Sequence, residues 1–121
     1  MTTPEQKLES LGLTLPKPSA PVANYVPYVT SGNLVFISGQ ISKIGDHAIG
    51  GRLGEDLTVE EGQKAAKLSA LNLIAQMKAA CGGDLSRVVR VVKLGGFVQA
   101  LPGATQADIP KVINGCSDIM V

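Results

Sequence analysis

The sequence predicts an α+β domain in which helices cover one face of a mixed β-sheet. Strand and helix patterns follow one another in the order strand, strand, helix, strand, helix, which is typical of that class. The 121 residues are 45% hydrophobic and 17% charged, which suits one aliphatic core and leaves no room for a second. We therefore expect a single domain over residues 1–121.

An extra helix is predicted before the strands, within residues 1–12. Thr3, Pro4 and Gln6 form a capping-box pattern with proline in the first helical turn, and Gly12 ends the helix. Residues 13–24 contain three prolines. Because proline has no amide donor and restricts the residue before it, we expect this stretch to lack regular structure.

Two β-rich runs, residues 25–30 and 33–42, predict a hairpin with its turn at Ser31 and Gly32. We expect Phe36 to be buried in this hairpin. Residues 43–57 are rich in glycine and charge, and they predict either a long loop or a glycine-bent hairpin. His47, the one histidine, lies there without a spacing cue, so we interpret it as a solvated loop residue rather than a general base.

The clearest helix pattern covers residues 59–81, after a second capping box at Thr58–Glu61 and before Gly82 and Gly83. A mainly apolar stripe repeats along it at spacings of three and four, and it consists of Ala65, Leu68, Leu71, Ile74, Ala75 and either Met77 or Lys78. The polar residues of the same helix map largely away from that stripe: Gln63, Lys64, Lys67 and Gln76. We expect the stripe to pack on the sheet.

A β-branched run at residues 88–98 predicts a central strand. Gly95 and Gly96 within it predict a bulge or a close approach by another group, with a simple irregularity as the alternative. Asp108 and Pro110 predict the start of a last helix that runs to residue 121. Helices on one face leave the other, aliphatic face of the sheet bare, so we expect self-association.

Composition argues against several functional classes. A net charge of +1 and an aromatic share of 3% disfavour nucleic-acid binding. No apolar run approaches the roughly 20 residues that span a bilayer, and the first ten residues are polar, so a cytoplasmic protein without a membrane partner is expected. Cys81 and Cys116 are expected to be reduced thiols packed as small hydrophobes. Nucleotide, zinc and hydrolase motifs are absent, so we expect no cofactor and no metal.

Polar residues on the predicted strands form the candidate binding site. Tyr25, Ser38, Gly39 and Gln40 lie on the hairpin, Gly95 and Gly96 accompany them on the later strand, and Asn114 lies on the last helix. A serine within a strand more often satisfies a local hydrogen bond than attacks a substrate, and both interpretations stay open.

These residues carry a resemblance to a known family. Tyr25, the turn at residues 31–33 and the segment Ser38-Gly39-Gln40 resemble the first hairpin of the reactive intermediate deaminase (Rid) family, also called the YjgF or L-PSP endoribonuclease family. The long helix with its Gly-Gly-Asp-Leu exit and the run at 88–98 follow in the family's order. The resemblance covers residues 20–121, and residues 11–29 are similar to a subgroup with an extra N-terminal helix.

The resemblance implies a chorismate-mutase-like fold, a homotrimer and clefts between subunits. It also implies hydrolysis of reactive enamines and imines, such as 2-aminoacrylate, to 2-oxo acids and ammonia. Tyr25, Ser38, Gly39 and Gln40 match the family's binding site directly, whereas Asn114 matches it through the Val-Ile-Asn pattern of the last helix. Two alternatives stand beside this activity: a non-catalytic trimer that binds small carboxylates, and an endoribonuclease acting on single-stranded RNA.

The resemblance also implies residues that this sequence does not contain. In the family an arginine holds the substrate carboxylate, a carboxylate positions the attacking water, and both lie on strands after the last helix. The sequence ends at Val121, and Arg52, Arg87 and Arg90 do not match that arginine. We therefore expect a C-terminally incomplete domain, and the catalytic residues stay unassigned.

Overall fold

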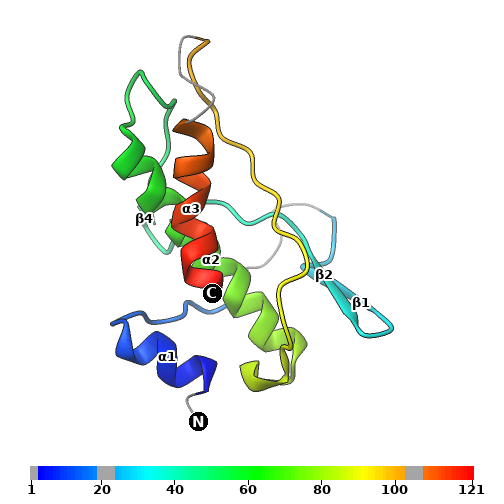
Figure 1. Cartoon of the computed structure of the whole chain (residues 1–121). Coiled ribbons are helices and arrows are strands. Elements are labelled where there is room, and N and C mark those ends of the chain that lie inside the picture. The colour runs from blue at the N-terminus through cyan, green and yellow to red at the C-terminus, as the bar shows by residue number, and fades with distance from the viewer. Residues whose placement is uncertain (1–2, 19–23, 103–107) are drawn as a thin grey trace. The chain divides into compact units, whose positions relative to one another are not determined.

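A computed structural model of the chain describes residues 3–18, 24–102 and 108–121. Three α-helices, a short 3-10 helix and four short strands occur in these residues (Figure 1). Their order is α1 (Pro4–Ser10), β1 (Tyr28–Ser31), β2 (Leu34–Ile37), β3 (Lys43–Ile44), β4 (His47–Ala48), α2 (Val59–Ala80), η1 (Leu85–Arg87) and α3 (Asp108–Met120). The predicted α+β class is confirmed.

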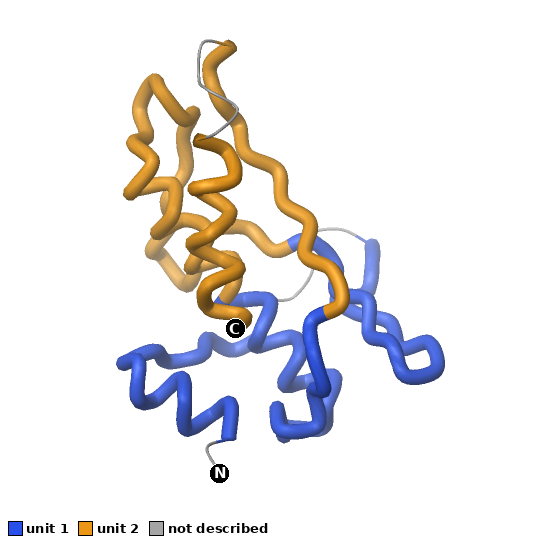
Figure 2. Tube along the Cα trace, viewed as in Figure 1, with its two compact units in different colours: residues 1–39, 71–91 blue, residues 40–70, 92–121 orange. Residues whose placement is uncertain are grey.

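The chain forms two compact units, which Figure 2 distinguishes by colour. Unit 1 consists of Met1–Gly39 and Leu71–Val91, and unit 2 of Gln40–Ala70 and Val92–Val121. Helix α2 therefore contributes its first half to unit 2 and its second half to unit 1.

Helix α1 forms in unit 1 as its capping residues predict. The Thr3 hydroxyl accepts the Gln6 amide at 3.2 Å, and the Gln6 side chain accepts the Thr3 amide at 2.9 Å. Gly12 follows the helix with φ of 72°, a conformation that favours glycine. The Glu5 carboxylate accepts the Leu85 amide of η1 at 2.7 Å, so α1 is tied to a segment 80 residues further along the chain.

The predicted hairpin is present, but its strands are shorter and its turn lies one residue later. Ser31 pairs with Leu34, which leaves Gly32 and Asn33 as the two turn residues, and Gly32 has φ of 59°. A positive φ at the first turn position only is the signature of type II′. The prediction that Phe36 is buried is wrong: the residue is 60% exposed, because no described residues cover that side of the two-stranded ribbon.

Helix α2 begins and ends where the sequence predicts. The Thr58 hydroxyl accepts the Glu61 amide at 3.1 Å, and the Glu61 carboxylate accepts the Thr58 amide at 3.2 Å. At the other end the Gly82 and Gly83 amides donate to the carbonyls of Ala79 and Lys78, which is the Schellman arrangement.

The middle of α2 is buried on more than the one apolar face that the sequence predicts. Leu71, Ile74 and Ala75 are buried as predicted. The prediction that Gln76 faces away is wrong, since only 1% of that residue is exposed, and neighbouring Asn72 is 3% exposed. Both side chains have interaction partners, so their burial leaves no unsatisfied amide, and polar residues share the core here.

In unit 2 the glycine-rich stretch forms the glycine-bent hairpin, one of the two predicted alternatives. Lys43 pairs with Ala48 and Ile44 pairs with His47, with Gly45 in the turn at φ of 59°. His47 is exposed, but it lies in β4 rather than in a loop. The turn that follows buries Leu53, whose amide donates to the Gln99 carbonyl at 2.9 Å.

The prediction of a strand at residues 88–98 is wrong for the described structure, which has no regular element there (Figure 1). A strand needs a neighbour that accepts and donates its backbone hydrogen bonds, and among the described residues such pairing begins only at the Leu53–Ala100 bridge. Four of its apolar side chains are open to solvent, most completely Val89 and Phe97, which are 95% and 105% exposed. Gly96 does serve a close approach, because a Cβ there would lie 2.5 Å from Ile113 Cδ1.

Two glycines let α3 lie against the first half of α2 within unit 2 (Figure 1). A Cβ at Gly62 would lie 2.8 Å from Val112 Cγ2, and a Cβ at Gly115 would collide with the backbone carbonyl of Gln63. The Gln63 side chain also donates to the Lys111 carbonyl at 2.9 Å. The described helices include none that is long and apolar enough to cross a bilayer.

The buried apolar residues of the described chain contain no aromatic side chain, as the composition predicts. They are Leu8, Leu53, Ala70, Leu71, Ile74, Ala75, Leu85, Val112 and Cys116.

Candidate functional site

The open end of the β1–β2 hairpin is organised by Pro27. The ladder runs from Ser31–Leu34 to Tyr28–Ile37, and the next residue on the first strand is a proline without an amide hydrogen. The Pro27 carbonyl instead accepts two hydrogen bonds from Ser38, from its amide at 2.9 Å and from its hydroxyl at 3.1 Å. Ser38 is thereby fixed at the point where the strands stop pairing.

This contact bears on the role of Ser38. A serine nucleophile has to transfer its proton to a base, whereas this hydroxyl donates to a backbone carbonyl. The local-hydrogen-bond interpretation is therefore supported. A hydroxyl held in this way suits orientation of a ligand rather than covalent attack.

Two hydrogen-bond donors accompany Ser38 at the same end of the hairpin. Tyr25 lies two residues before Pro27, is 44% exposed, and its phenol has no hydrogen bond to another described residue. Gly39 is exposed, and its amide donates to no backbone carbonyl of the described residues. A phenol and a backbone amide are both donors that suit a carboxylate.

The other two predicted site residues belong to unit 2. Gln40 is half-buried and has an interaction partner. Asn114 lies on α3 and is exposed, whereas Val112 and Cys116 of that helix are buried. Within the described structure, Tyr25, Ser38 and Gly39 thus share the hairpin end, and Gln40 is joined to them through the chain.

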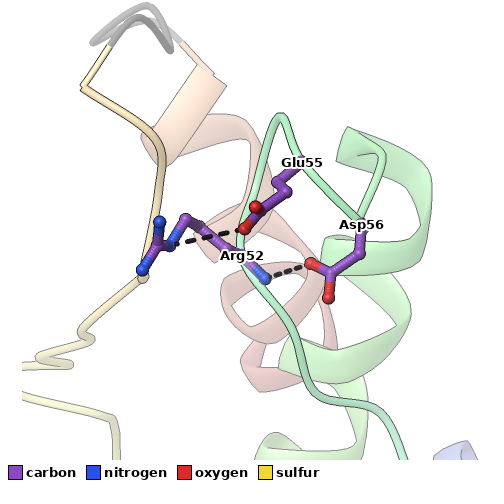
Figure 3. A network of polar contacts seen from close by, with 3 residues as sticks. All are labelled: Arg52, Glu55 and Asp56. Atoms are coloured by element: carbon purple, nitrogen blue, oxygen red, sulfur yellow. Dashed lines mark hydrogen bonds and ion pairs between the residues drawn. The ribbon is translucent and has the colours of Figure 1, made fainter.

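A polar turn at residues 51–57 is a feature that the sequence analysis did not predict. The Arg52 amide donates to the Asp56 carboxylate at 2.6 Å, and Arg52 Nε lies 3.7 Å from Glu55 Oε2 (Figure 3). Gly51 has φ of 144°, and a Cβ there would lie 2.7 Å from Asp56 Oδ1. The acidic pair Glu55-Asp56 after Gly51 is the signal in the sequence, because a short carboxylate next to a glycine commonly closes a turn.

Among the described residues, Asp84 and Cys116 have displaced pKa values. The Ser86 hydroxyl and amide donate to Asp84, and they are the first two causes that lower the pKa of this carboxyl, followed by the smaller effects of Arg87 and Lys78. Burial raises the pKa of the Cys116 thiol. Both groups lie outside the hairpin end, and each is explained by local structure.

Within residues 3–18, 24–102 and 108–121, no three histidine, cysteine or acidic side chains gather in a way that could hold a metal ion. The donor set at the hairpin end is a phenol, a hydroxyl and a backbone amide. Such groups recognise polar organic ligands rather than transition metals.

Comparison with known proteins decides the family. A family model described as "YjgF/chorismate mutase-like, putative endoribonuclease" matches residues 5–121. The chain belongs to this YjgF family. The match covers the hairpin, α2 and α3, so the family resemblance seen in the sequence is confirmed, and with it the chorismate-mutase-like fold.

Relatives of this YjgF chain include a protein of Trypanosoma cruzi named Protein TCP17. The two are 47% identical over 116 residues, which is 94% of this chain and 70% of that protein. A crystal structure described as a "putative endoribonuclease" from Shewanella oneidensis MR-1 matches with a TM-score of 0.90 and 39% identity, covering 98% of this chain and 77% of that one.

A second crystal structure, of protein Atu1372 "with unknown function" from Agrobacterium tumefaciens, matches with a TM-score of 0.84 and 45% identity. The match covers 97% of this chain and 71% of that one. Identities at this level together with these TM-scores show a shared fold along nearly all of the present YjgF chain.

Proposed function

We propose that the protein is an enamine/imine deaminase that hydrolyses 2-aminoacrylate-like intermediates to 2-oxo acids and ammonia. Membership of the YjgF family gives this activity general support, because the chain shares the family's fold. The observation that carries the proposal is the hairpin end, where Ser38 is anchored on the Pro27 carbonyl, the exposed Tyr25 lies two residues before Pro27, and the exposed Gly39 follows Ser38.

The reaction needs only water as a co-reactant. The enamine first takes a proton on carbon and becomes the imine, water adds to the imine carbon, and the carbon–nitrogen bond then breaks. One 2-oxo acid and one ammonia leave for each water consumed. Because the substrate is a small carboxylate that hydrolyses without help, orientation and transition-state hydrogen bonds suffice for acceleration.

Each hairpin residue has a binding role in this proposal. The Tyr25 phenol and the Gly39 amide donate to the substrate carboxylate. The Ser38 oxygen accepts from the substrate nitrogen or from the attacking water. Gln40 and Asn114 stay predicted binding residues, and the residue that activates water is unassigned.

The hairpin also supports the proposed homotrimer. Val29, Leu34, Val35 and Phe36 are each at least 40% exposed, and they occupy both faces of the ribbon. Exposed apolar surface of this kind is typical of an association site. Because the hairpin carries Tyr25 and Ser38, an interface formed there would lie next to the proposed site. A cytoplasmic location is proposed with the same activity, since the intermediates arise from pyridoxal enzymes.

A coupled assay tests the activity. A threonine or serine dehydratase generates the imine, and 2-oxo acid release is followed with and without the full-length protein. We expect faster release in its presence, and Tyr25→Phe and Ser38→Ala each to reduce the acceleration about tenfold, which is the worth of one hydrogen bond to a charged group. Tyr28→Phe is the matched control, because Tyr28 lies in the paired part of β1.

The outcomes separate the competing functions. No acceleration from a folded trimer rejects the deaminase. If calorimetry then detects binding of 2-oxobutanoate without turnover, the protein is a small-carboxylate-binding trimer.

An endoribonuclease is the second candidate, because the matching family and the Shewanella structure are both described by that activity. Its test is cleavage of single-stranded RNA by the nuclease-free protein. Cleavage has to disappear with Ser38→Ala to be assigned to this site. The net charge of +1 gives little attraction for a phosphate backbone, which is why the deaminase is placed first.

A further inference from the structure

A cavity of about 350 Å³ that is open to solvent lies within unit 1, between the proline-containing segment after α1 and the last turns of α2. This volume is within the range of small-molecule sites. None of its lining residues belongs to the hairpin end. They are Leu15, Pro16, Lys17, Pro18, Ala75, Lys78, Ala79 and Gly83.

Six of the eight lining residues are apolar, and four of the eight are exposed: Lys17, Pro18, Ala79 and Gly83. Ala75 is only 3% exposed, and Pro16 and Pro18 have fixed φ angles. The fixed φ angles of the two prolines reduce the conformational entropy that this segment loses when a ligand binds. The lining therefore suits a short hydrocarbon chain.

The charged residues of the lining are both lysines. Neither Lys17 nor Lys78 forms an ion pair with a carboxylate in the described part of the chain. Lys78 is the smallest of the causes that lower the pKa of Asp84, a carboxylate that does not line the cavity and whose Oδ1 is held by the Ser86 amide at 3.0 Å and the Ser86 hydroxyl at 2.6 Å. The cavity thus combines positive charge with an apolar surface.

The carboxyl end of α2 does not cancel this preference for an anion. The Lys78 carbonyl accepts the amides of Cys81 at 3.2 Å and Gly83 at 2.8 Å, and the Ala79 carbonyl accepts the amide of Gly82 at 3.2 Å. The partial negative charge at the end of a helix comes from carbonyl oxygens without a hydrogen-bond donor. Because these carbonyls have donors, they repel an anion in the cavity less strongly.

We propose that this cavity binds a medium-chain aliphatic carboxylate, with the carboxylate at Lys17 and Lys78 and the chain along Leu15, Pro16 and Ala75. A flexible ammonium group is a point charge that suits a single carboxylate. A nucleotide fits less well, because the lining contains no aromatic ring and no guanidinium group. The site is separate in its residues from the proposed imine site.

The test is a titration of the ¹⁵N-labelled full-length protein with sodium octanoate. We expect saturable shifts of the Ala79 and Gly83 amide signals below about 10 mM, the range expected for a weak ligand of this size. The double variant Lys17→Gln, Lys78→Gln should bind octanoate at least about tenfold more weakly, because each lysine supplies a charge-assisted contact. Octanol, with the same chain and no charge, should produce much smaller shifts.

Two further variants make the result specific. Lys67→Gln removes an exposed lysine of α2 that does not line the cavity, and it should bind octanoate as the wild type does. Ala79→Trp should fill the cavity and abolish the shifts, with imine hydrolysis unchanged. Absence of saturable shifts, equal binding by the double lysine variant, or shifts confined to Tyr25, Ser38 and Gly39 would each overturn the proposal.

Discussion

The helices of this protein and its β-rich segments have similar apolar content but different surroundings. Leu71, Ile74 and Ala75 of α2 are at most 7% exposed, whereas Val89 and Phe97 of the 88–98 run are almost completely exposed. A helix makes its backbone hydrogen bonds within itself, so its capping residues and apolar spacing suffice to define it. A strand depends on a neighbour, and an apolar run without one stays irregular and open.

The largest contrast is expected between Leu71→Ala and Phe36→Ala. Leu71 is 6% exposed and Phe36 60% exposed. Truncating the buried leucine should lower the free energy of unfolding by about 3 kcal/mol, through lost apolar contact and a cavity. The phenylalanine substitution should cost less than about 1 kcal/mol in the monomer.

Urea unfolding of both variants measures this difference, and sedimentation reports the oligomer. A loss for Phe36→Ala as large as that for Leu71→Ala would mean that a partner subunit covers the hairpin. The trimer should then weaken in the same variant.

The next effect concerns the contact between α2 and α3. A Cβ at Gly115 would collide with the Gln63 carbonyl, a backbone group that cannot rotate away. We expect Gly115→Ala to lower the free energy of unfolding by about 2 kcal/mol, although alanine favours the helix.

Gly95→Ala in the irregular run is the matched control. A Cβ there meets nothing within 4 Å, so a change within about 0.5 kcal/mol is expected. Equal effects of the two substitutions would show that the close helix contact is not required.

A smaller effect is expected at the start of α2. Thr58→Ala removes the acceptor of the Glu61 amide and should cost about 1 kcal/mol. Thr30→Ala in the exposed strand β1 should cost no more than about 0.5 kcal/mol. Thermal unfolding of the pair gives the comparison, and a Thr30 effect above the Thr58 effect would contradict the assignment of the cap.

The smallest effect is a pH dependence from Cys116. Burial raises the pKa of this thiol, so the unfolded chain loses the proton at a lower pH than the folded chain. The stability contributed by this group is complete below the ordinary thiol pKa and falls as pH rises through the raised value. Urea midpoints between about pH 8 and about pH 10.5 should decline less steeply for Cys116→Ala than for Cys81→Ala. Parallel declines would exclude Cys116 as the cause.

The sequence predicts the helices of this fold to within about a residue, because the signals at their ends are local. The side chains of Thr3 and Thr58 and the two glycines after α2 make the predicted capping contacts. The burial of Gln76 could not be predicted from the sequence, because it depends on which other segments pack around the helix. The predicted strand at 88–98 is wrong for a related reason. Its β-branched residues favour a strand, but a strand forms only where a neighbouring segment pairs with its backbone.

The candidate site was predictable only in part. The position of Ser38 followed from its place at the end of a strand, but its bond to Pro27 depends on the register of the hairpin. Tyr25 and Asn114 are ordinary polar residues by their local pattern, and the resemblance to the family gave them their expected binding role. The turn around Arg52 was not predicted, because its acidic residues cannot be distinguished by sequence from ordinary solvent-exposed charges.

The double hydrogen bond on Pro27 has a consequence for the fidelity of folding. In most hairpins one face is buried, and a slip of one residue is rejected because it exposes the apolar side chains. Here Val29, Val35 and Phe36 leave both faces apolar, so the side-chain pattern discriminates weakly between registers. Gly32 at the turn and the Pro27–Ser38 contact at the open end fix the alignment from both ends, and a slipped hairpin would lose both at once.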